Sequence, residues 1–157
     1  MDSIIDPTAD VLFNAVVYDI TAAGVDEQRP KTREEWAEVR RHALLLAEAA
    51  DLLRMPGRRV APSRTVLELE ADDPVPGDLT LEETQALIDD DPAAFARLAQ
   101  PLRDAAVLAL DAADAMQVDD LFAAGAAIDK ACETCHLKYW YPRDRTPARD
   151  ALSRQKK

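Results

Sequence analysis

Two cysteines and a histidine near the C-terminal end are the residues best suited to chemistry in this chain. The segment reads Cys132-Glu133-Thr134-Cys135-His136, and it holds both cysteines of the 157-residue sequence. Cys-x-x-Cys-His is the sequence that attaches a c-type haem. Residues three and four apart share a helix face, so both thiols can reach one porphyrin while the imidazole of His136 faces its iron. The pattern predicts one covalent haem c per chain.

Three other interpretations of these residues stay open. A redox dithiol also uses Cys-x-x-Cys, although usually at a helix N-terminus, where the thiol pKa is lowered. A zinc site needs further ligands, and the only other histidine is His42. The third interpretation is a chance pair of buried thiols beside a histidine. Covalent haem is preferred because the five-residue pattern occurs in a chain whose composition favours helices.

Composition predicts a helical, globular chain with an acidic surface. Alanine and leucine dominate the apolar residues, aromatic residues make up 5%, and there are only 4 glycines. The net charge is −11, which argues against nucleic acid as a partner because phosphate favours Lys and Arg. Residues 138–157 hold seven basic and two acidic side chains, a charge of +5, which leaves −16 on residues 1–137. No apolar run approaches the length of a membrane span.

Hydrophobic spacing predicts four main helices, because apolar residues recur three and four positions apart in four segments. The expected helices run from Pro7 to Ala22, from the capping box of Thr32 and Glu35 to Met55, from Pro92 to Met116, and from Asp119-Asp120 to the cysteines. Asp6 is expected to cap the first helix, and Gly24 is expected to end it. A second capping box, Thr80 with Glu83, predicts a further short helix to Asp89. Residues 58–78 are expected to form a long connecting loop. We therefore expect an all-α fold, an antiparallel four-helix bundle with haem at the C-terminal end of the last helix.

With these expected helices and the Cys-x-x-Cys-His motif, the chain resembles the cytochrome c-prime family of four-helix haem proteins. The segment from Ile128 to Tyr139 carries most of the resemblance, and Trp36 on the second expected helix supports it. The resemblance implies a haem domain over residues 1–141, with a basic extension over residues 142–157. It implies electron transfer with redox partner proteins. It also implies maturation in the bacterial periplasm, since thioether attachment occurs outside the cytoplasm, although no export signal is visible here.

Departures from the family pattern affect the haem edge. Family members often place a basic residue four positions after the haem histidine, where this chain has Trp140. Tyr139, Trp140 and Tyr141 could close the end of the bundle or form a patch for a docking partner. Arg58 and Arg59 could pair with haem propionates, or else be ordinary surface arginines.

The distal side of the iron decides between two functions. In the family the distal residue comes from the first helix, and Met1 is the first candidate for a sulfur ligand, which would give a six-coordinate electron-transfer haem. Without a ligand there, Leu12 and Phe13 would wall an open iron site that binds NO or CO. Met55, Met116 and His42 are weaker ligand candidates.

No constellation of acid, base and nucleophile is visible, so the chain is not expected to be an enzyme. A third class of function is a helical interaction module with incidental cysteines. The partners expected for a cytochrome are redox proteins, with a small gas ligand and a homodimer as the other options.

Overall fold

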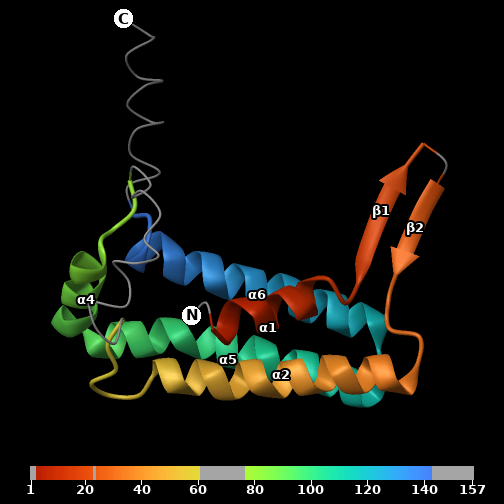
Figure 1. Cartoon of the computed structure of the whole chain (residues 1–157), viewed down its shortest axis with the longest axis horizontal. Helices are drawn as coiled ribbons and strands as arrows, with labels where there is room; N and C mark the ends of the chain where they lie inside the picture. The colour runs from red at the N-terminus through yellow and green to blue at the C-terminus, as the bar shows by residue number, and fades with distance from the viewer. Residues whose placement is uncertain (1–2, 23, 61–76, 143–157) are drawn as a thin grey trace, which may run out of the picture.

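The computed structural model describes residues 3–22, 24–60 and 77–142, and Figure 1 shows its arrangement. In these residues it has five helices and one two-stranded hairpin, so the expectation of a mainly helical chain is confirmed. No helix in the described ranges combines the length and apolarity needed to cross a bilayer. The candidate ligand Met1, most of the expected 58–78 loop and residues 143–157 of the basic extension lie outside the described residues.

The first helix is shorter than expected and begins earlier. α1 spans Ile5–Phe13, its N-cap is Ile4, and the backbone N–H of Asn14 closes it on the carbonyl of Asp10. Asp6 and Pro7 therefore lie inside the first turn. Proline is tolerated there because the first N–H groups of a helix have no intrahelical acceptor. Asp6 does not cap the helix, contrary to the sequence-based expectation.

Residues expected to complete that helix form a β-hairpin instead. β1 spans Val17–Thr21 and pairs antiparallel with β2, Gly24–Gln28. The helix was predicted here because Val17 and Ile20 fit a three-residue spacing. The stretch is nevertheless rich in β-branched residues, which favour strands. Gly24, expected to end a helix, opens β2 with a φ of +134° that glycine readily adopts.

Both capping boxes form as predicted. α2 spans Arg33–Leu53, and the Thr32 hydroxyl accepts the N–H of Glu35 while the Glu35 carboxylate accepts the N–H of Thr32. The same reciprocal pair joins Thr80 and Glu83 ahead of α4, Leu81–Asp90. These bonds satisfy N–H groups that a helix leaves without acceptors. They explain why both starts were readable from sequence.

The last two helices follow each other across a sharp turn. α5 spans Pro92–Ala115, and the Asp91 carboxylate accepts the N–H of Ala94 at its start. Met116 ends α5 in the left-handed region, at φ 52°. α6 then spans Val118–Tyr139 and includes both cysteines.

Four helices share one core. α5 packs against α2 and α6, and α1 lies against α2 and α6, with α1, α2, α5 and α6 running in alternating directions (Figure 1). The largest fully buried side chains are Leu46, Leu121 and Ile128. Most of the remaining core is alanine, including Ala43, Ala50, Ala106 and Ala109, all fully buried. Small side chains permit close helix approach, since interaxial distance depends on the residues at the contact.

Candidate functional site

The cysteines and the histidine lie together on the last two turns of α6. Cys132, Cys135 and His136 are all half-buried, and both cysteines are free thiols. Cys132 packs against the main core. The two residues between the cysteines, Glu133 and Thr134, are exposed. The motif is therefore on the inward flank of the helix, as its spacing predicts.

Burial dominates the ionisation of the thiols. Desolvation raises the pKa of Cys132 to about 11, with smaller contributions from Cys135 and from the carboxylates of Asp6 and Asp129. Desolvation also raises the pKa of Cys135, with Lys138 acting in the opposite direction. Both thiols are thus protonated at neutral pH. A redox dithiol needs a lowered pKa, so these surroundings do not favour that interpretation.

The imidazole of His136 is neutral and has an unused nitrogen. Burial lowers the pKa of His136, and the nearby carboxylates of Asp6 and Glu133 oppose that shift without reversing it. Its Nε2 atom is buried and has no hydrogen-bond partner among the described residues. A buried polar atom without a partner costs free energy. A neutral imidazole with such a nitrogen is suited to bind a metal.

Two aromatic rings contact the imidazole from beyond the helix end. The ring of Trp140 lies edge-on to His136, with 4.9 Å between centroids, and Tyr141 is 5.9 Å away. Trp140 is fixed in turn, because its Nε1–H donates to the carboxylate of Asp78 at 2.8 Å. The hydroxyl of Tyr141 donates to Glu133 at 2.5 Å. These contacts hold the position of the imidazole.

α4 and the residues before it anchor the end of α6. The N–H of Leu79 donates to the carbonyl of Trp140 at 2.7 Å, and the hydroxyl of Thr84 donates to the backbone carbonyl of Tyr139 at 3.0 Å. Tyr139 itself is buried, edge-on to Phe95 at 5.1 Å. The short helix thus holds the chain directly after the motif, a role that its sequence did not reveal.

Asp6 is the site residue that the sequence analysis missed. Its carboxylate is close enough to influence the pKa of both Cys132 and His136. The first turn of α1 therefore lies against the last turns of α6. The acid-proline pair suggested a helix cap, and only the packing of α1 against α6 shows what this carboxylate faces.

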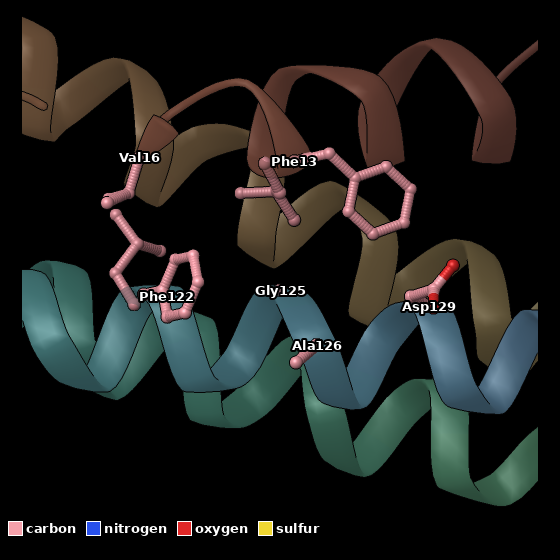
Figure 2. Close-up of a pocket in the computed structure, with 8 residues that line it drawn as sticks. Phe13, Val16, Phe122, Gly125, Ala126 and Asp129 are labelled. Carbon is pink, nitrogen blue, oxygen red and sulfur yellow. The ribbon is translucent and has the colours of Figure 1, made fainter. Parts of the chain in front are cut away.

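The two residues of α1 that were expected to wall the distal side lie against the part of α6 that precedes the cysteines. Leu12 and Phe13 line a pocket of about 260 Å³ with Val16 and with residues of α6 from Leu121 to Asp129 (Figure 2). Leu12 is buried, whereas the ring of Phe13 is partly exposed. Asp129 is three positions before Cys132, and the rest of the pocket is closer to the N-terminus of α6. The structure therefore brings Asp6, rather than Leu12 or Phe13, to the cysteines and His136.

The other expected site residues are placed as follows. Arg58 is exposed just after α2, in a segment that is tied to α4 by the bond from the N–H of Val60 to the Gln85 side chain at 2.9 Å. His42 contacts Glu38 at 2.9 Å on α2. Met116 precedes α6 and is 20 residues before His136, which on a helix is roughly 30 Å. That distance excludes Met116 as a ligand of the same iron.

No family model, no curated protein and no solved structure matches this chain.

Proposed function

We propose that this protein is a c-type cytochrome that carries one haem and transfers electrons. Cys132 and Cys135 would bind the haem through thioether bonds, and His136 would be its proximal ligand. The observation that carries the proposal is the placement of these three side chains on one half-buried flank of α6, with Nε2 of His136 lacking a partner among the described residues.

The chemistry of these side chains fits haem c. Thioether attachment requires two reduced thiols at this spacing, and both cysteines are free. Axial ligation requires a neutral imidazole, and burial lowers the pKa of His136. The Nε2 atom of that imidazole is buried and makes no hydrogen bond within the described ranges. In those same ranges, no group of three or more His, Cys, Asp and Glu side chains is arranged to hold a metal ion by itself.

The arrangement of the helices supports an antiparallel four-helix bundle that is similar to the cytochrome c-prime family. α1, α2, α5 and α6 alternate in direction around one core, and the motif is at the C-terminal end of the last helix (Figure 1). In such a bundle, cofactors are bound by side chains on facing helices. Here the facing element is the first turn of α1, which contributes Asp6.

The protein's own residues would set the behaviour of the iron. Haem, when bound, supplies reversible one-electron transfer. The cysteines would fix its orientation, and Trp140 and Tyr141 would hold the imidazole of His136 and limit the access of water on that side. The negative charges of Asp6 and Glu133 would favour the more positive, oxidised iron.

The experiment is maturation of the chain in a bacterial host that attaches haem c in its periplasm. The expected product has the mass of the chain plus one haem, and it keeps the haem in a denaturing gel. Cys132→Ser together with Cys135→Ser should abolish attachment completely. Thr134→Ser, between the cysteines, is the matched control and should leave it intact. A wild-type chain that gains no covalent haem would contradict the proposal.

The spectrum of the reduced protein then separates electron transfer from gas binding. A low-spin spectrum with weak CO binding supports a sixth ligand, for which Met1 stays our candidate. A high-spin spectrum with ready NO or CO binding would favour the gas-binding alternative. A periplasmic location is part of the same proposal, since attachment occurs outside the cytoplasm.

A further inference from the structure

The hairpin of β1 and β2 extends away from the helices, at the end of the molecule opposite α4 (Figure 1). Its base is fixed to the helical body. The side-chain amide of Gln28 donates to the carbonyl of Asn14 at 2.8 Å, and the ring of Tyr18 lies edge-on to Phe122 at 5.4 Å. The base therefore holds the hairpin in place, while the outer half of the hairpin lies beyond the bundle.

The strand register gives the hairpin an apolar face. Ile20 lies directly opposite Val25, and their side chains point to the same side. They are 82% and 65% exposed, and Ile20 is the most exposed large apolar side chain in the described residues. Exposed apolar side chains that lie next to each other can form part of an interaction surface.

The opposite face of the hairpin is acidic. Asp19 lies directly opposite Asp26, and like charges in that position destabilise a strand pair. Neither carboxylate has an ion-pair or hydrogen-bond partner among the described residues. Glu27, by contrast, is 3.6 Å from the guanidinium of Arg29 and interacts with the hydroxyl of Tyr18. Asp19 and Asp26 thus form an uncompensated negative pair.

The sheet also has edges that can accept another strand. In the part of the chain that the structure describes, the sheet contains only β1 and β2. Edge strands offer backbone N–H and C=O groups to an incoming chain, and a lone two-stranded hairpin is marginally stable in water. A third strand would satisfy those groups and cover part of the apolar pair.

We propose that this hairpin is a docking edge for an extended, basic segment of another protein, which adds to it as a third strand. Strand side chains alternate between faces, so the segment should alternate Lys or Arg with β-branched residues. A segment that pairs with the free edge of β1 would place its cationic side chains next to Asp19 and its apolar ones next to Ile20, and on the free edge of β2 the neighbours would be Asp26 and Val25. This is the strand-addition mode of peptide recognition.

Charge selects this occupant over others. A second copy of the chain would bring the same pair of aspartates to the interface. Nucleic acids and anionic lipid surfaces would be repelled by Asp19 and Asp26. The proposal does not rest on haem, and the hairpin is at the other end of the molecule from His136. A partner bound there would leave the Cys-x-x-Cys-His end uncovered.

The test uses the full-length, isotope-labelled protein and the peptide acetyl-Lys-Val-Lys-Ile-Lys-amide, followed by NMR. We expect saturable shifts confined to the backbone amides of residues 17–28. Acetyl-Lys-Lys-Val-Ile-Lys-amide has the same composition without the alternation, and acetyl-Glu-Val-Glu-Ile-Glu-amide has reversed charge. Both control peptides should bind more weakly.

Matched variants separate charge from apolar contact. D19N/D26N should weaken binding about threefold or more, because each exposed charge pair contributes modestly. D90N/D111N removes two exposed aspartates elsewhere and should leave binding unchanged. Ile20→Ser should also weaken binding, and its effect is interpretable because circular dichroism can confirm that the helices stay folded.

Three results would overturn the proposal. The first is equal binding of the alternating peptide and either control peptide, or shifts outside residues 17–28. The second is a dimer in analytical ultracentrifugation that Ile20→Ser dissociates, which would make a second copy the occupant. The third is a change in the hairpin resonances, without peptide, when Arg149, Arg154, Lys156 and Lys157 become glutamine. That result would make the chain's own basic tail the occupant.

Discussion

The two ends of this molecule differ in how far their side chains are exposed to solvent. At the end that carries Cys132, Cys135 and His136, polar and reactive groups are half-buried and surrounded by contacts. At the hairpin end, Ile20 and Val25 are turned toward solvent. The first end places chemistry inside the fold, and the second places apolar surface outside it.

The difference follows from how many elements surround each end. The last turns of α6 contact α1, α4 and α5, so a residue on their inward flank is covered and its ionisation changes. The hairpin contacts the helical body near its base, where Tyr18 packs on Phe122 of α6 and Gln28 donates to the carbonyl of Asn14. An isolated pair of strands cannot bury either face, and so its side chains remain available to a partner.

The largest effect should come from His136→Ala. If the protein carries the proposed haem, both thioether bonds remain possible in this variant, so the mass of the matured protein should still include one haem, while proximal ligation by His136 is lost. Absorption and electron paramagnetic resonance spectra should change to those of a different coordination state. Lys138→Gln, two positions along and exposed, is the control. Unchanged spectra in His136→Ala would show that another residue is the proximal ligand.

The same substitution in α6 and in the hairpin should have very different consequences for stability. Ile128→Ala removes a fully buried side chain of α6 and should lower the free energy of unfolding by about 2–5 kcal/mol. Ile20→Ala, on the exposed hairpin, should change it by no more than about 0.5 kcal/mol. Urea unfolding followed by circular dichroism measures both. Similar losses would mean that the hairpin is part of the core.

Burial of the thiols predicts a slow alkylation reaction in the haem-free protein. The pKa of Cys132 is raised from 9.0 to about 11, so at pH 8 it has about 100-fold less thiolate than an ordinary thiol. Alkylation of Cys132 by iodoacetamide should be slower by about that factor than in the urea-unfolded chain, and it should accelerate as pH rises toward 11.

The same shift gives a pH dependence of stability, with a definite sign. A thiol whose pKa is higher in the folded state stabilises the fold fully below pH 9, and this contribution is lost as pH rises through about 11. Equal alkylation rates in the folded and unfolded chain would show that the cysteines are accessible to solvent. The two ends of the molecule would then not differ in the burial of their side chains.

The smallest effect should be seen at the hairpin. Asp26→Asn removes the repulsion with Asp19 across the strands and should stabilise the hairpin locally by about 0.2–1 kcal/mol. Slower amide hydrogen exchange in residues 17–28 is the expected measurement. Glu27→Gln loses the interaction with Arg29, so it should not slow exchange. Faster exchange in Asp26→Asn would show that the Asp26 carboxylate stabilises the hairpin by more than its repulsion with Asp19 costs.

The sequence predicted the helix starts far better than the hairpin. Thr32 with Glu35 and Thr80 with Glu83 are local signals, since each box satisfies its bonds within four residues. The stretch after Phe13 was misassigned because the three-residue spacing of its apolar residues fits a helix as well as a strand. The local spacing of these residues does not decide between the two.

The candidate site was predictable where it is local in sequence and unpredictable where it is not. Cys132, Cys135 and His136 form a pattern within five residues, and the helix between them was expected. Asp6 is more than 120 residues away, and Asp78 is more than 50 residues before Trp140. Their approach depends on how α1 and α4 pack, which no local pattern in the sequence encodes.

The alanine core limits which amino-acid substitutions this protein tolerates in its interior. At fully buried positions such as Ala106 and Ala109, every apolar replacement is larger, and enlarging a packed core is destabilising. Glycine is the one smaller choice, and it weakens a helix. Natural variation at these positions should therefore be confined to alanine, glycine and serine, whereas the hairpin, which packs against almost nothing, can change its side chains as partners change. In this way one chain could keep a constant interior while its recognition surface diverges.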